Sequence, residues 1–201
     1  MLTQLSTVKA RLGLQPTDPT YDDLLVRVIT AVSARFDQET HRTLARSENA
    51  RFEFPAEACE IVIPCYPIES VTRFELKTSE GAGWIEQPAV DYLIRRNCIL
   101  SLSSALADLQ CATGNLPPAL ARVTYTGGYL LPDSSTVTGA VPLPADLEQA
   151  AIEQTVFWFQ TREQVGVVRL WPKGGLYEQF ADPDLLPSVR QTLRQHTRLL
   201  C

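Results

Sequence analysis

The spacing of the hydrophobic residues changes twice along the chain, and this constrains the fold more than any single motif. Up to residue 46 the apolar residues recur every three or four positions, as in the series from Leu24 and Leu25 to Phe36, which is typical of an amphipathic helix. From residue 47 to 130, short runs of β-branched and aromatic residues are separated by turn residues. The helical spacing returns from residue 144 onward.

This order predicts an α+β protein. Residues 1–46 and 144–201, from both chain ends, are expected to build one helical unit, and residues 47–130 an inserted antiparallel β region. The connections between the predicted strands are too short for crossover helices, so antiparallel pairing is expected, with a hairpin across Arg96 and Asn97. Residues 131–143 are rich in Pro, Ser and Thr, which predicts a flexible loop.

The predicted helix from about residue 144 to 163 carries two separate apolar faces. The first face consists of Leu147, Ala151 and Trp158. The second face consists of Ile152, Val156 and Phe159. Because each apolar face needs a surface to pack against, we expect the first face to meet the chain's own core. The second face is expected to contact the β insertion or a neighbouring subunit.

Composition excludes several classes of protein. The 201 residues carry a formal net charge of −5 at pH 7, which disfavours nonspecific binding to DNA or to a membrane surface. No apolar run is long enough to span a bilayer, and the first residues lack the apolar centre of a signal peptide, so we expect a cytoplasmic protein or a component assembled in the cytoplasm. The five cysteines include no Cys-x-x-Cys pair, which favours isolated buried thiols over disulfides or a metal site.

The sequence contains no residue set that indicates catalysis. Its two histidines, His41 and His196, each lie near the end of a predicted helix, where an interaction with the helix dipole or a surface role is the simpler interpretation. Asp182 and Asp184 precede the last predicted helix, where their negative charges would interact favourably with the positive end of its dipole. Motifs for a nucleophile elbow, a phosphate-binding loop or a zinc-binding helix do not occur. We therefore predict no catalytic residue, no metal ligand and no cofactor.

Four segments, taken in order, carry a resemblance to a known family. They are residues 8–44, 61–76, 121–163 and 185–200. The third segment is the most specific, because a strand ending in Tyr-Thr-Gly-Gly-Tyr is followed by a loop and by Val-Pro-Leu-Pro-Ala-Asp-Leu at a helix start. In order and spacing the chain resembles the head–tail adaptor, or connector, proteins of long-tailed bacteriophages and of the related gene transfer agents.

The resemblance implies a structural protein of the virion that is assembled in the host cytoplasm. Adaptors of this family form a closed, cyclic ring of about a dozen copies. Such a ring docks under the portal protein of a DNA-filled head and presents a surface to the next neck, stopper or tail-completion protein. DNA passes through the ring without specific binding, and the family has neither catalytic residues nor a membrane partner.

The C-terminal residues are the candidates for the portal contact. Arg190, Arg194 and Arg198 follow one another at four-residue steps on the last predicted helix, and Leu199 and Leu200 come directly after. In the family the C-terminal segment commonly reaches the portal, so the resemblance implies contact there. The alternative is a solvated face whose positive charges interact favourably with the negative, C-terminal end of the helix dipole.

Trp171 is a further interface candidate. It begins the turn Trp-Pro-Lys-Gly-Gly, where a large aromatic side chain either anchors the loop in the core or contacts a neighbouring subunit. Both interpretations stay open on the sequence alone.

Two other functions are compatible with the same residues. The β region could be a small module that binds a carbohydrate or a protein, with Trp84, Tyr92 and Tyr125 as stacking surfaces, although core packing explains these side chains equally well. The chain could also be an enzyme whose site matches no known motif.

Overall fold

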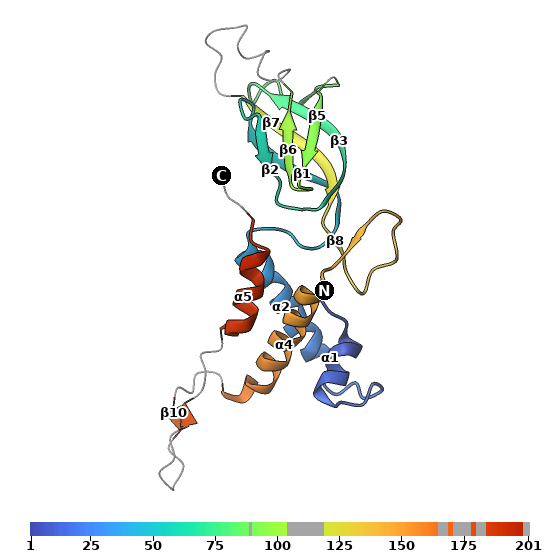
Figure 1. Ribbon diagram of the computed structural model, residues 1–201, viewed down its shortest axis with the longest axis vertical. Helices are drawn as coiled ribbons and strands as arrows, with labels where there is room; N and C mark the ends of the chain where they lie inside the picture. The colour runs from blue at the N-terminus through green and yellow to red at the C-terminus, as the bar shows by residue number, and fades with distance from the viewer. Residues whose placement is uncertain (89, 104–118, 165–168, 171–177, 180–183, 199–201) are drawn as a thin grey trace. The chain divides into compact units, whose positions relative to one another are not determined.

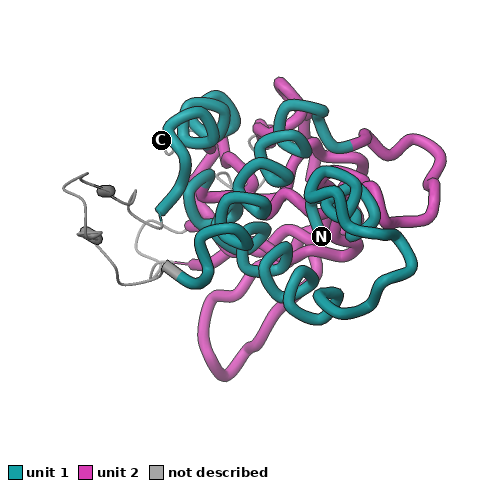
Figure 2. The backbone as a smooth tube through the Cα atoms, turned by 90° about the horizontal axis from the view of Figure 1, so that it is seen from below, with its two compact units in different colours: residues 1–40, 143–197 teal, residues 41–142, 198–201 magenta. Residues whose placement is uncertain are grey.

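The computed structural model describes residues 1–88, 90–103, 119–164, 169–170, 178–179 and 184–198. The chain divides into two compact units, which Figure 2 distinguishes by colour. The first unit comprises Met1–Thr40 and Leu143–Thr197, and the second comprises His41–Pro142 and Arg198–Cys201. Helices from both chain ends and an inserted set of mainly antiparallel strands make an α+β protein, as the changes in hydrophobic spacing predict.

The first unit is helical (Figure 1). Its elements are α1 (Leu5–Leu12), α2 (Asp22–Thr40), α4 (Ala145–Gln160), the 3₁₀ turn η1 (Arg162–Gln164), the short strands β10 (Arg169–Leu170) and β11 (Glu178–Gln179), and α5 (Pro187–Gln195). Gly13 ends α1 in the left-handed conformation, and Pro187 begins α5, where its missing N–H costs no hydrogen bond. Helix α2 ends at Thr40 and His41 has a φ of 53°, so the helical part of the N-terminal segment is shorter than the expected 1–46.

Helix α4 contacts α1, α2 and α5, so the chain itself covers both of its apolar faces. Leu147 and Ala151 are buried as predicted, whereas Trp158 is only half-buried. Phe159 belongs to a buried cluster with Val8, Leu25 and Ile29. Ile152 is also buried, and Val156 packs against the same cluster.

For Phe159 and Val156, the prediction that this second face of α4 meets the β insertion or a neighbouring subunit is therefore wrong, whereas for Ile152 it stays a prediction. The physical reason is α1, which has only eight residues but supplies the second packing surface. Val8 of α1 is fully buried, and Phe159 of α4 lies in the same cluster.

Within its described residues, the second unit contains two antiparallel sheets and one parallel strand pair. The four-stranded sheet has the order β1 (Ser47–Pro55), β7 (Leu120–Gly127), β3 (Ile68–Lys77), β4 (Ile85–Glu86). The three-stranded sheet has the order β2 (Glu60–Val62), β6 (Ile99–Leu102), β5 (Tyr92–Arg95). The expected hairpin joins β5 to β6: Arg96 and Asn97 have φ angles of 51° and 57°, and the N–H of Cys98 donates to the carbonyl of Arg95.

One core joins the two sheets of this unit. Phe54, Phe74 and Val123 of the larger sheet and Ile61 and Leu100 of the smaller sheet belong to the same buried cluster. Along β6, Leu100 and Leu102 are buried while the alternate residues are half-exposed, which is the pattern of a strand with one face on a core.

The Gly-Gly pair after β7 allows a close approach of three backbone segments. A Cβ atom on Gly127 would lie 2.6 Å from the carbonyl oxygen of Cys65, and one on Gly128, whose φ is 100°, would lie 2.6 Å from that of Ala45. Residues 41–46 therefore belong to the β unit rather than to the helical unit. The two ends of the expected 131–143 loop are held by a short parallel pair, β8 (Tyr129–Leu130) with β9 (Val141–Pro142).

Candidate interaction site

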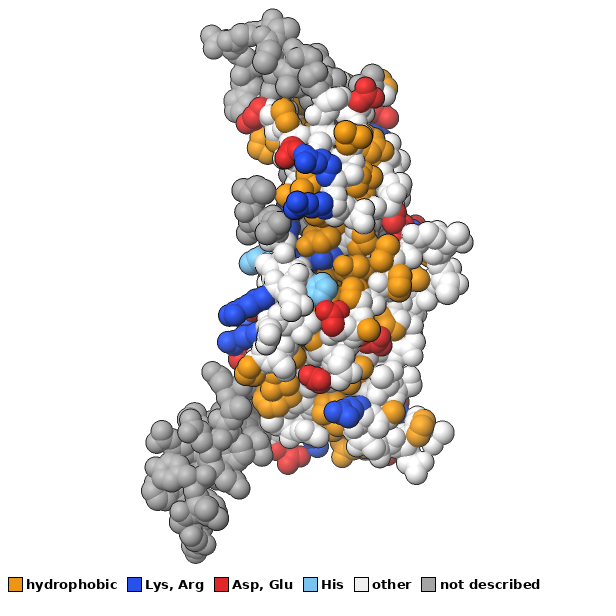
Figure 3. Space-filling view, in the orientation of Figure 1, with side chains coloured by type: hydrophobic (Ala, Val, Ile, Leu, Met, Phe, Trp, Pro, Cys, Tyr) orange, Lys and Arg blue, Asp and Glu red, His pale blue; other side chains and the backbone are white. Residues whose placement is uncertain are grey.

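Helix α5 exposes a basic face. Val189 and Leu193 are buried on its inner side, and Arg190 and Arg194, one turn apart on the helix, are exposed. Basic side chains stand out over α5 in the space-filling view (Figure 3). The sequence prediction therefore places these two arginines correctly on the helix surface.

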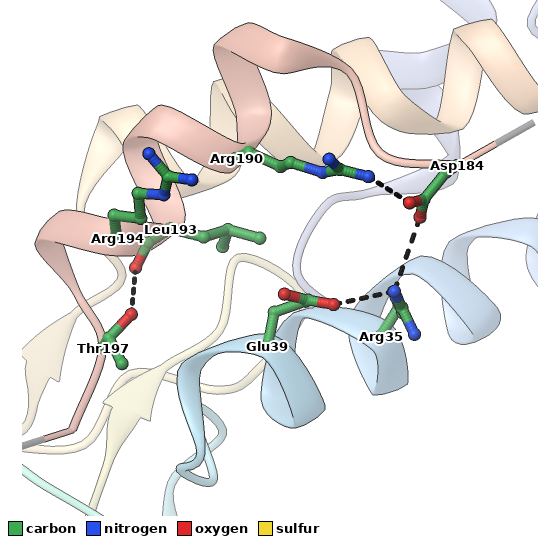
Figure 4. A pocket seen from close by; sticks show the side chains of 7 residues that line it. All are labelled: Arg35, Glu39, Asp184, Arg190, Leu193, Arg194 and Thr197. Atoms are coloured by element: carbon green, nitrogen blue, oxygen red, sulfur yellow. Dashed lines mark hydrogen bonds and ion pairs between the residues drawn. The ribbon is translucent and has the colours of Figure 1, made fainter. Parts of the chain in front are cut away.

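A groove of about 290 Å³ runs between α2 and α5 (Figure 4). Its lining residues come from α2, from the segment just before α5 and from α5 with the residues after it: Arg35, Glu39, Asp184, Arg190, Leu193, Arg194 and Thr197. Three guanidinium groups and two carboxylates line the groove, which leaves one positive charge in excess. This local balance is opposite in sign to that of the whole chain.

Asp184 is the centre of the ion pairs in the groove. Its Oδ1 lies 3.4 Å from Nη2 of Arg35, and its Oδ2 accepts a hydrogen bond from Nη2 of Arg190. The same Arg35 nitrogen lies 2.7 Å from Oε1 of Glu39. A hydrogen bond from the backbone N–H of Leu185 holds the pKa of Asp184 below its ordinary value against the opposing effect of burial, and the charges of Arg190 and Arg35 lower it further.

Gln154 fixes this corner of the groove from α4. Its side chain is fully buried, Nε2 donates to the carbonyl of Asp184 at 3.3 Å, and Oε1 accepts from the N–H of Leu186 at 2.9 Å. Both ends of the amide are thus used to hold the two backbone groups on either side of Leu185. The entry into α5, and with it Asp184, is therefore held in place by a hydrogen-bonded core residue.

Arg194 differs from the other arginines of the groove. Among the residues that the structure describes, no acidic side chain pairs with it, and Figure 4 shows its guanidinium directed away from Asp184 and Glu39. A second hollow of about 330 Å³ lies on the other side of Arg190 and Arg194 from the groove. It is lined by Pro187, Arg190, Gln191 and Arg194. Arg190 and Arg194 thus form a basic ridge with a hollow on each side.

The prediction of a three-arginine ridge is wrong for Arg198. Helix α5 ends at Gln195, so Arg198 is not on the helix and belongs to the β unit. Its Nη2 donates to the carbonyl of Val62, and its Cζ lies 5.3 Å from the ring centre of Phe52. The helix stops because the N–H of His196 turns back to the carbonyl of Leu193. Leu199, Leu200 and Trp171, the other candidates, lie outside the described residues.

The aromatic side chains proposed for a ligand-binding β module do not form a platform. Tyr125 is buried, and its hydroxyl accepts a hydrogen bond from the N–H of Cys65. Trp84 is stacked under the guanidinium of Arg122, at 4.2 Å from Cζ to the ring centre, and Tyr92 contacts the ring of Phe74. Of the two alternatives for Tyr125, a stacking surface or core packing, the structure shows core packing.

The described residues offer few groups that could bind a metal ion or react. Across the described ranges, no cluster of three or more His, Cys, Asp or Glu side chains could hold a metal ion. No described helix has the length and apolar character needed to cross a membrane. Of the cysteines, Cys65 is buried as predicted, Cys98 is half-buried and Cys59 is exposed, while Cys111 and Cys201 are not described.

Sequence reasoning named Arg190, Arg194 and Asp184 but did not find the other residues that shape the groove. Arg35 and Glu39 stand four positions apart on one helix, and this spacing was a signal for an ion pair. Nothing in the sequence connects Arg35 to Asp184, which is 149 positions away, or marks Gln154 as a buried anchor.

Comparison with known proteins yields structural neighbours only. No family model matches the chain, and no curated protein matches it. Among solved structures, the chain is similar to one in the neck of an empty gene transfer agent particle computed with C6 symmetry, with a TM-score of 0.57, 14% identity, and coverage of 97% of this chain and 89% of that one.

Two further structures give the same result. A chain in the virion of a native gene transfer agent particle has a TM-score of 0.54 and 16% identity, with 95% and 86% of the two chains covered. A chain in the neck of a native particle computed with C12 symmetry has a TM-score of 0.50 and 14% identity, with 89% and 84% covered. At these identities the likeness establishes a shared fold along almost the full length of both chains.

Proposed function

We propose that this protein is a structural adaptor in the neck of a phage-like particle. The observation that carries the proposal is the match of its α+β fold, over 97% and 95% of its length, to chains in the neck of one gene transfer agent particle and in the virion of another. The particle neck, assembled in the host cytoplasm, is the proposed location.

The adaptor would act as a ring. The structures it resembles were computed with C6 and C12 symmetry, which supports a closed cyclic assembly of about twelve copies. The ring would sit between the portal protein of a DNA-filled head and the next neck, stopper or tail-completion protein. DNA would pass through it without specific binding, and the negative net charge of the chain supports this, because phosphate contacts need Lys and Arg.

The portal contact is proposed at the C-terminal end. The exposed ridge of Arg190 and Arg194 is the described part of that surface, and Leu199 and Leu200 stay candidates for the same contact. Many copies in a ring multiply a weak contact, so each contact can be modest.

The test is in vitro completion of portal-bearing heads that lack the protein. Wild-type protein is expected to add a ring under the portal, visible by electron microscopy, and to restore tail attachment. A double change of Arg190 and Arg194 to Glu should stay folded and abolish attachment, whereas Arg27→Glu, an exposed arginine on α2, should not. Heads that acquire tails equally well without the protein would refute the adaptor role.

A further inference from the structure

The spacing of the two arginines on the basic ridge of α5 selects for a matching spacing of negative charges, and not for negative charge alone. Arg190 and Arg194 are four residues apart, so their Cβ atoms lie about 6 Å from each other along one helix face. Carboxylates at the same spacing on a facing helix would meet both guanidinium groups at once. The hollows of about 290 and 330 Å³ on the two sides of the ridge leave room for the side chains next to those carboxylates.

The groove already binds one carboxylate of its own chain. Asp184 is held by Arg35 and Arg190, which shows that the arginines of this groove can converge on a carboxylate from different elements. Glu39 occupies the remaining side of Arg35. Arg194 is the position where the described part of the groove provides a cation and no anion.

We propose that the basic ridge of α5 binds an acidic helix of a partner protein, whose carboxylates, one helical turn apart, bind Arg190 and Arg194 while neighbouring side chains enter the groove between α2 and α5. Identification of the partner as a portal or neck component rests on the proposed function, whereas the chemistry of the groove does not. The net charge of −5 on the chain makes a local basic groove selective, because an acidic partner is repelled elsewhere on the surface.

The probe is a short alanine-rich helical peptide with glutamates at i, i+4 and i+8, compared with an isomer in which the same glutamates are spread around the helix. Binding to the full chain is measured by NMR chemical-shift changes in low and high salt. The one-faced peptide should bind more tightly than its isomer, with shifts in α5 and in Arg35, and high salt should weaken binding.

Variants separate the groove from the rest of the surface. Arg194→Gln breaks no described ion pair and should weaken peptide binding by about two- to fivefold, the range of an exposed ion pair. Arg27→Gln, an exposed arginine of the same unit outside the groove, should leave binding unchanged. Asp184→Asn removes the intramolecular competitor and should tighten binding, a direction that partial unfolding would not produce.

The outcomes are distinguishable from those of the adaptor test. Equal binding of the two peptides, or undiminished binding by Arg194→Gln, would overturn the proposal even if the protein completes heads. The expected peptide results would sustain the groove assignment even if heads acquire tails without the protein, in which case only the adaptor role fails.

Discussion

Asp146 and His196 join the beginning of α4 to the end of α5, with 2.7 Å between Oδ2 of the aspartate and Nε2 of the histidine. Oδ1 of the same aspartate accepts a hydrogen bond from the N–H of Leu147 in the first turn of α4. One carboxylate thus bonds to the first turn of one helix and holds the chain directly after another. Burial raises the pKa of Asp146, but the hydrogen bond and charge of His196 and the Leu147 amide outweigh it, so the pKa lies below its ordinary value.

The first prediction is a pH-dependent contribution of Asp146 to stability. Because its pKa is depressed in the folded state, the stabilisation is present above the ordinary value of 3.8 and is lost as pH falls through the folded-state pKa. Asp146→Asn should cost under about 1 kcal/mol near neutral pH, since the aspartate is partly exposed. Urea unfolding across this pH range should show the difference from wild type vanish in acid. Asp23→Asn, in the first turn of α2, serves as control, and a difference that persists in strong acid would contradict the assignment.

The second prediction concerns Lys9, which is only 3% exposed although charged. Its Nζ lies 2.5 Å from Oδ1 of Asp22 and donates to the carbonyls of Asp18 at 2.7 Å and Pro16 at 3.2 Å, so it holds the turn between α1 and α2. Lys9→Met should destabilise the helical unit by about 2–4 kcal/mol, because it leaves these acceptors without their donor. Thermal unfolding followed by circular dichroism measures this.

The matched control for Lys9 is Lys77→Met, since the partner of Lys77, Glu80, is 90% exposed. That change should cost well under about 1 kcal/mol. Comparable losses for the two variants would mean that the Lys9 contacts add nothing beyond an ordinary surface charge.

The third prediction addresses the Gly-Gly pair that follows β7. Gly127→Ala and Gly128→Ala should each destabilise the β unit by about 2 kcal/mol or more, since the new methyl group would meet backbone oxygen atoms that cannot move independently. Gly81→Ala, with open space around its position, should be neutral within about 0.5 kcal/mol. Hydrogen exchange of the β7 amides provides the measurement, and unchanged protection in Gly128→Ala would disprove the tight approach.

The hydrophobic spacing was sufficient to predict most of the regular structure. It placed α2, α4 and the start of α5, because each of these has an apolar stripe. A proline reinforces the pattern at two of the helix starts, directly before α4 and at the first residue of α5. The β5–β6 hairpin was predictable for a local reason as well: an asparagine in a two-residue connection tolerates positive φ. Such signals lie within a few residues of the element they specify.

What covers an apolar face could not be predicted in the same way. The two faces of α4 were evident, but spacing does not say that an eight-residue helix at the other end of the chain packs on one of them. The groove was hidden for the same reason, since Asp184 meets Arg35 only through the tertiary fold. Arg198 shows the limit at a helix end, where hydrogen bonds of the last turn, and not residue spacing, decide which side chains share a face.

The fourth prediction concerns the buried hydroxyl of Tyr125, which is 1% exposed. Burial raises the pKa of this phenol well above its ordinary value, and its oxygen accepts the N–H of Cys65 at 3.2 Å. Tyr125→Phe should cost about 1–3 kcal/mol by leaving that N–H without an acceptor. Tyr92→Phe, at the more exposed β5 edge, should cost little. Unchanged exchange of the Cys65 amide in Tyr125→Phe would show that the hydrogen bond is unimportant.

The last prediction decides what Phe159 does. Its ring is buried with Val8, Leu25 and Ile29 and makes an edge-to-face contact with Tyr21, at 5.4 Å between ring centres. An aspartate there would remove the ring from this cluster and place a carboxylate among apolar side chains, a loss that the guanidinium of Arg162, 4.2 Å from the ring centre, would offset only in part. Phe159→Asp should therefore cost about 3–5 kcal/mol and unfold the helical unit, with loss of helical circular dichroism.

The control for this last change is Leu24→Asp on α2. Leu24 is 38% exposed, so the same introduced charge should leave the helical signal and the melting temperature close to those of wild type. A Phe159→Asp protein that melts like wild type but cannot enter a ring would contradict the core assignment and restore an interface role for this residue. Loss of folding in Phe159→Asp but not in Leu24→Asp would instead establish that α1, α2 and α4 share one core, whatever the protein binds.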